Sequence, residues 1–198
     1  MKQFKKEFTT LTLVLIPVAI AINLAVGQLV IALKLPLYLD SIGTVLVAVL
    51  VGPWAGAVTG VISNVIWTAT GWFPQAIAWA GVAAVIGIMA SAFKQGGWFE
   101  RGWKASLSGL ITGIVAALLS APISAFVFGG VTGTGTDVLV AAFSGTFGLD
   151  ILGANMAQGV VSDPIDKLVT FLIVWLLLKA LPNRLKTLFS RQEENELE

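Results

Sequence analysis

The sequence contains neither cysteine nor histidine, and only 12% of its 198 residues are charged. Without cysteine there is no disulfide and no thiolate nucleophile; without histidine there is no imidazole base, and zinc sites of the usual kind lose their main ligands. The net charge of +1 argues against a nucleic-acid partner. We therefore expect no metal site, no bound cofactor and no nucleic-acid partner.

The chain is instead strongly apolar. Hydrophobic residues make up 57% of it, and its mean hydropathy is +0.90. A soluble domain of this size cannot hide so much apolar surface, so we expect lipid to surround most of it. Seven tryptophans and 21 glycines are typical of packed membrane helices. The predicted fold class is an all-α membrane protein, with residues 1–198 forming a single integral-membrane domain.

Six transmembrane helices are predicted by comparing the apolar runs with the about 20 residues that a spanning helix needs. They cover residues 11–33, 39–52, 54–71, 73–93, 104–128 and 162–181. Merging the second and third into one kinked helix across Gly52-Pro53 is the alternative. The basic start and the Ala19-x-Ala21 sequence also resemble a signal peptide, but the apolar run continues to Leu33, so we expect the first span to be retained.

The basic residues decide between these topologies. Ten of the twelve lysines and arginines form three clusters: Lys2, Lys5 and Lys6; Lys94, Arg101 and Lys104; and Lys179, Arg184, Lys186 and Arg191. A turn at Gly52-Pro53 places all three clusters in the cytoplasm, as the positive-inside rule requires, whereas a single crossing leaves two of them outside. Both termini are therefore predicted to be cytoplasmic, including the polar tail 183–198.

The predicted external segment 129–161, between the fifth and sixth helices, is much longer than the median connection of about four to six residues. Its apolar stretches predict short helices that begin at Thr136 or Asp137 and near Asp150. Long loops with structure of their own are typical of binding elements. We expect this segment to form a lid over a site that opens outward.

Charged residues at the predicted start of the sixth helix have two interpretations. In the structural one, Asp163 caps the helix, Pro164 takes the first helical position, and Asp166 faces free N–H groups at the third. In the functional one, these carboxylates and Lys167 surround a ligand beneath the lid. Asp40-Ser41 is likewise interpreted as a cap, here for the second helix.

Candidate binding residues are the polar and aromatic side chains near the outer ends of the spans. Asn64 and Trp67 lie deeper than an interfacial belt, where a polar amide needs a partner; that partner is a ligand or another helix. The predicted substrate-binding residues are Tyr38, Asp40, Asn64, Trp67, Gln75, Trp79, Asn155, Asp163 and Lys167.

Three features together resemble the S component of energy-coupling factor (ECF) vitamin transporters. These are the Ala21-x-x-x-Ala25 pair in a six-span chain with cytoplasmic termini, the stretch YLDSIGTVLVAVLVGPWAGAVTG from Tyr38, and VSDPIDK from Val161. The chain is most similar to the riboflavin-type S-component family, which includes cobalamin-binding members. The resemblance covers about residues 10–182.

The resemblance implies a high-affinity vitamin-binding subunit in a bacterial plasma membrane. It implies docking through Ala21 and Ala25 onto a transmembrane coupling subunit, which is driven by two separate ATPase subunits. The chain has no phosphate-binding loop of its own, so it is not expected to be an enzyme. Cobalamin is the first substrate expected, and riboflavin the second.

Two rival functions are a stand-alone secondary carrier and an intramembrane lipid-modifying enzyme. The enzyme needs titratable groups that converge inside the membrane, and the predicted spans place their charges at helix ends. Carriers usually show intramembrane carboxylates or inverted repeats with broken helices, and only the Gly52-Pro53 break qualifies.

Overall fold

The computed structural model describes residues 6–182 and Leu188, and this part of the chain is helical without any strand. Its α-helices are α2 (Thr10–Ala32), α3 (Ile42–Leu50), α4 (Pro53–Thr70), α5 (Ala80–Gln95), α6 (Gly102–Phe128), α7 (Asp137–Phe147) and α8 (Ile151–Ala180). Two short 3-10 helices, η1 (Ala76–Trp79) and η2 (Trp98–Glu100), precede α5 and α6. The all-α prediction is confirmed. Lys2, Lys5 and the tail 183–198, apart from Leu188, lie outside the described residues.

Three helical segments are long and apolar enough to cross a membrane: Thr10–Ala32, Ala76–Gln95 and Gly102–Phe128. The expected turn at Gly52-Pro53 is present, because α3 ends at Leu50 and Pro53 is the first residue of α4. Helix α3 has only nine residues, so it covers about 14 Å at 1.5 Å per residue. That is less than half of a hydrocarbon core of about 30 Å.

Helix α3 is buried among the other helices. Seven of its nine residues are buried. Val45 and Ala48 belong to a core shared with α5, α6 and α8, whereas Val47 packs with Ile16 and Ala19 of α2. The short helix therefore joins the two halves of the bundle.

Helices α6 and α8 approach until their backbones touch. A Cβ atom on Gly113 would lie 2.4 Å from the Cα atom of Pro164, and one on Gly109 would lie 2.4 Å from the carbonyl oxygen of Lys167. Small residues permit this distance in membrane bundles. The contact fixes the Asp163–Lys167 turn of α8 against α6.

The prediction that the last helix starts at Asp163 is wrong. Helix α8 starts at Ile151 and runs for 30 residues, and Asp150 is its N-cap, accepting a hydrogen bond of 2.9 Å from the Gly153 N–H. Asp163, Pro164 and Asp166 lie inside the helix and are buried. The expected helix starts near Asp137 and Asp150 are confirmed. The segment between α6 and α8 covers residues 129–150, which is shorter than the predicted 129–161, and we refer to it as the lid segment after the role expected from the sequence.

The cap expected at Asp40-Ser41 is only partly present. Ser41 occupies the N-cap position of α3, but its side chain makes no capping hydrogen bond. Its hydroxyl donates instead to Asp40 Oδ1 over 2.8 Å.

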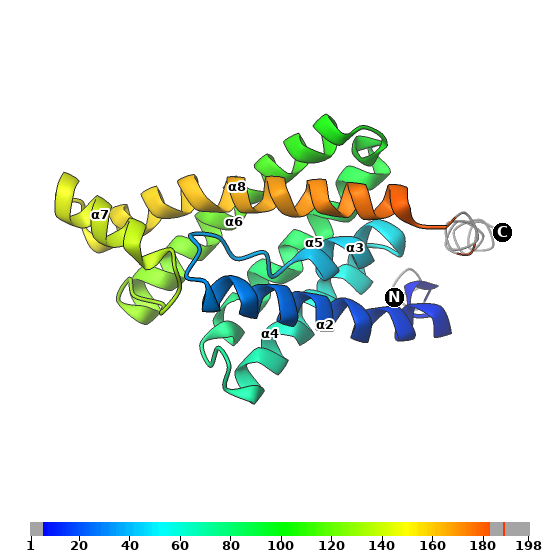
Figure 1. Ribbon diagram of the computed structural model, residues 1–198, viewed down its shortest axis with the longest axis horizontal. Helices are drawn as coiled ribbons and strands as arrows, with labels where there is room; N and C mark the ends of the chain where they lie inside the picture. Colours follow the sequence, from blue (N-terminus) through cyan, green and yellow to red (C-terminus); the bar gives the residue numbers. More distant parts are fainter. Residues whose placement is uncertain (1–5, 183–187, 189–198) are drawn as a thin grey trace.

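Figure 1 shows α8 and α2 extending along the long axis of the molecule, with α7 at one end. The first residues of α2 and the last residues of α8 both lie toward the opposite end (Figure 1). The lid segment, which contains α7, therefore lies far from the start of α2 and from the end of α8 (Figure 1).

We predict that Gly113→Ala lowers the stability of the bundle by about 1 to 3 kcal/mol, because the new methyl group must push α8 away from α6. Thermal unfolding in detergent measures the effect. Gly145→Ala is the matched control, since Gly145 lies inside α7 and a methyl group added there would have no other atom within 4 Å. Equal melting temperatures for Gly113→Ala and the wild type would contradict the close approach.

Candidate functional site

A cavity lies beneath the lid segment, where the loop 34–40 meets α4, α6 and α8. The empty space between its walls is about 910 Å³, including the part open to solvent. Of the predicted site residues, all except Gln75 line it: Tyr38, Asp40, Asn64, Trp67, Trp79, Asn155, Asp163 and Lys167. Gln75 is half-buried at the start of η1 and lies outside this lining.

The cavity also has polar lining beyond the predicted substrate-binding residues. The additional hydroxyl and amide side chains belong to Ser41, Thr44, Ser120, Ser124, Thr132, Thr134, Thr136 and Gln158. Threonines 132, 134 and 136 alternate with glycine in the lid segment, a pattern that resembles an ordinary flexible loop. They are distinguished by a chain of hydroxyl contacts that reaches Tyr38 through Thr136.

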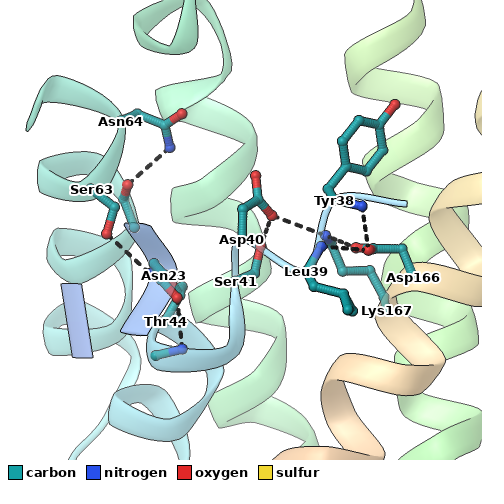
Figure 2. Close-up of polar contacts among 12 residues, drawn as sticks. Asn23, Tyr38, Leu39, Asp40, Ser41, Thr44, Ser63, Asn64, Asp166 and Lys167 are labelled. Atoms are coloured by element: carbon teal, nitrogen blue, oxygen red, sulfur yellow. Dashed lines mark hydrogen bonds and ion pairs between the residues drawn. The ribbon is translucent and has the colours of Figure 1, made fainter. Parts of the chain in front are cut away.

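Asp166 fixes the loop that enters the cavity. This side chain has no exposed surface, and its Oδ1 atom accepts hydrogen bonds from the N–H groups of Tyr38 (2.8 Å) and Leu39 (2.7 Å). Its Oδ2 atom accepts from Lys167 Nζ, and Figure 2 shows these contacts converging on one carboxylate. Leu39 has a φ of 50°, a left-handed conformation that is uncommon for leucine. Asp166 therefore selects the backbone conformation that places Tyr38 and Asp40 at the cavity.

The ammonium group of Lys167 forms ion pairs with two carboxylates, those of Asp166 and Asp40. Besides its contact with Asp166, its ammonium group lies 3.6 Å from Asp40 Oδ1 and 5.9 Å from the centre of the Tyr38 ring. The Lys167 side chain is buried, whereas that of Asp40 is 37% exposed. The ion pairs connect α8 to the segment that precedes α3.

Tyr38 connects the lid segment to α8. Its hydroxyl donates to Thr136 Oγ1 over 3.2 Å and accepts from Gln158 Nε2 over 3.3 Å. The Thr136 hydroxyl in turn lies 2.8 Å from the Thr134 hydroxyl, which lies 2.9 Å from the Thr132 hydroxyl. The Thr132 hydroxyl donates to the Asp137 carboxylate. Burial, and after it the negative charge of Asp163, raises the pKa of Tyr38 above its ordinary value. Tyr38 therefore stays a neutral donor at physiological pH.

An aromatic wall lines another side of the cavity. Trp79 is stacked between Phe73, at 6.0 Å between ring centres, and Phe128, at 5.0 Å. Trp67 meets Phe73 edge-on at 5.8 Å. This geometry is favourable for aromatic pairs and gives the wall a defined shape. The apolar body of a ligand can pack against it.

The two asparagines of α2 and α4 make protein contacts. Asn23 donates to Thr44 Oγ1 (2.9 Å) and Ser63 Oγ (3.0 Å) and accepts from the Gly43 N–H (2.7 Å), so it fastens α2 to α3 and α4 (Figure 2). Asn64 donates to the Gly60 carbonyl oxygen of its own helix over 3.0 Å, not to another helix. Asn64 still lines the cavity, whereas Asn23 supports its floor.

In the part of the chain that the structure describes, no three acidic side chains are arranged to hold a metal ion. Comparisons of the chain with protein-family models, curated proteins and solved structures found no match.

We predict that Asp166→Ala destabilises the protein by about 3 to 5 kcal/mol, because it leaves the buried Lys167 ammonium without its nearest counter-charge. The two loop N–H groups lose their acceptor as well. Thermal unfolding of the purified chain in detergent measures the loss.

The control is the double variant Asp166→Ala/Lys167→Met, compared with Lys167→Met alone. Removing both charges should recover part of the stability, since no unpaired ammonium remains. Strictly additive losses would show that the two side chains do not act as a pair.

Proposed function

We propose that this chain is the S component of an ECF-type importer and binds a vitamin-sized molecule in the cavity. The observation that carries the proposal is the composition of the cavity: an aromatic wall and buried charged groups under a segment tied down by hydrogen bonds. Small-molecule sites combine apolar walls with a few convergent polar groups in this way. The chain around the cavity has three helices of membrane-spanning character.

We further propose six spans with both termini in the cytoplasm of a bacterial cell. The start of α2 and the end of α8 lie at the same end of the molecule, far from α7, which supports an external lid and cytoplasmic termini (Figure 1). The positive-inside rule supports the same orientation. The cavity would then open toward the outside.

The exposed face of α2 is the proposed docking surface for the transmembrane coupling subunit. Ala21 and Ala25 are both exposed, whereas Ala19 and Asn23 face the bundle. Small exposed residues four apart permit close approach of another membrane helix. ATP hydrolysis is assigned to two separate ATPase subunits, so the chain itself is not proposed to be an enzyme.

Cobalamin and riboflavin remain the substrates proposed. The amide side chains of Asn155 and Gln158 line the cavity and can form hydrogen bonds with either vitamin.

A stand-alone secondary carrier is the second candidate, and one observation favours it. The expectation that charges lie only at helix ends is wrong, because Asp163, Asp166 and Lys167 are buried inside α8. Buried ionisable groups in membrane helices often belong to ion or proton pathways. Transport by the chain alone, without ATP, would favour this function.

We predict that the purified chain retains one of the two coloured vitamins. The protein in detergent is incubated separately with cobalamin and riboflavin, desalted, and its visible absorption spectrum recorded. Retained colour near one equivalent supports vitamin binding and names the substrate. If neither pigment is retained, both vitamins are eliminated as substrates.

We predict that Ala25→Trp abolishes ATP-driven uptake into liposomes that contain the coupling subunit and ATPases, while ligand binding by the isolated chain is unchanged. The bulky ring would prevent helix contact at the docking face. Leu118→Trp is the control, since Leu118 is 50% exposed on α6. If both variants transport normally, α2 is not the docking surface.

A further inference from the structure

Asp163 is a buried carboxylate without a partner among the residues that the structure describes. It is 5% exposed and lines the cavity. Within that part of the chain it makes no hydrogen bond and no ion pair within 4.0 Å. Lys167 lies one helical turn further along α8, but its ammonium group is held by Asp166 and Asp40.

The other acidic groups that line the cavity have hydrogen-bond or ion-pair partners. Asp137 accepts hydrogen bonds from the N–H groups of Thr132 (3.1 Å) and Gly133 (2.7 Å), and Asp40 accepts from Ser41 and pairs with Lys167. The charged residues in the lining are three aspartates and one lysine, and that lysine also pairs with Asp166, so negative charge is in excess at the cavity. A carboxylate removed from water without a compensating charge is costly. Asp163 is the one of these aspartates that has no hydrogen bond and no ion pair within 4.0 Å among the described residues.

Gly159 leaves this carboxylate open to the cavity. Gly159 precedes Asp163 by one helical turn and also lines the cavity. A Cβ atom there would lie 3.4 Å from Asp163 Oδ2, in van der Waals contact, so the absence of a side chain at Gly159 leaves space beside that oxygen. The aromatic wall belongs to the same cavity, and aromatic rings attract cations as well as apolar groups.

We propose that the ligand of this cavity is a heteroaromatic cation and that the Asp163 carboxylate is its counter-ion. The aromatic wall contacts the ring system, and Asp163 accepts from, or pairs with, the positively charged nitrogen. This inference rests on the proposed function in one respect, that the cavity is the ligand site. It keeps the proposed role of a vitamin-binding subunit and replaces the uncharged riboflavin with a positively charged vitamin as the substrate.

Thiamine and thiochrome are a suitable pair of probes, because thiamine carries a permanent positive charge and thiochrome is its ring-closed, uncharged relative. Binding of each to the full chain in detergent is measured by calorimetry, together with riboflavin as an uncharged vitamin. The variant Asp163→Asn keeps the shape of the side chain and removes its charge. The control Asp150→Asn removes one charge at the N-cap of α8, where asparagine caps equally well.

We expect the wild type and Asp150→Asn to bind thiamine with equal affinity and thiochrome more weakly. Asp163→Asn should bind thiamine about 10- to 100-fold more weakly, which is the effect expected for losing a charged hydrogen-bond partner. Melting temperatures of both variants in the absence of ligand establish that they are folded. If Asp163→Asn does not fold, Asp163→Glu replaces it, and a shifted carboxylate should weaken thiamine binding without affecting thiochrome.

Other outcomes distinguish failure of the cation inference from failure of the proposed vitamin-binding function. Riboflavin bound equally by the wild type and Asp163→Asn overturns the cation inference but leaves the vitamin-binding function in place. Thiamine bound equally by both proteins overturns the role of Asp163. Binding of neither thiamine nor thiochrome also overturns the inference, while uptake in the presence of the coupling subunit and ATP then decides the proposed function separately.

Discussion

The geometry of the cavity depends on the carboxylate of Asp166. Its oxygens are shared between two consecutive backbone N–H groups and the ammonium group of Lys167. Hydrogen bonds to an ionised group are stronger than neutral ones, and here they compensate for a left-handed leucine in the loop 34–40. The same turn of α8 is fixed from behind, because Gly109 and Gly113 let the backbone of α6 touch it. A rigid helix pair therefore presents the charged groups, while the loop adapts to them.

The types of structural element could be predicted from the sequence more accurately than the residues at which each element begins and ends. The helical class, the turn at Gly52-Pro53 and the helix starts near Asp137 and Asp150 follow from local rules of apolar length and capping, and the structure confirms them. The SDPIDK motif satisfies the same rules, yet it lies inside α8. A cap pattern depends on a few residues, whereas the 30-residue continuity of α8 depends on its packing against α6, which no local pattern contains.

The residues of the candidate site could likewise be predicted only in part. Asp163, Lys167 and Trp67 are conspicuous as charges or aromatics near helix ends, and the cavity brings them together. Gln75 has the same appearance in the sequence but lies outside the cavity, since the direction of a side chain in a turn depends on tertiary contacts. The threonines of the lid segment show no individual signal. They are recognisable only as the hydroxyl chain that connects Tyr38 to the start of α7.

The lid segment is connected to the loop 34–40 through that hydroxyl chain. Left-handed glycines stand at both of its ends, Gly129 and Gly130 before α7 and Gly148 after it, so the backbone there tolerates large rotations. Helix α8, by contrast, is continuous beneath the lid. In the part of the chain that the structure describes, one neutral hydrogen bond, from the Tyr38 hydroxyl to Thr136, joins the lid segment to the loop 34–40, and such a bond is worth only about 0.5 to 1.5 kcal/mol. In the proposed function, opening of the lid segment would break this contact and leave the charged cluster of α8 intact, so that a ligand could enter a site whose charges remain in place.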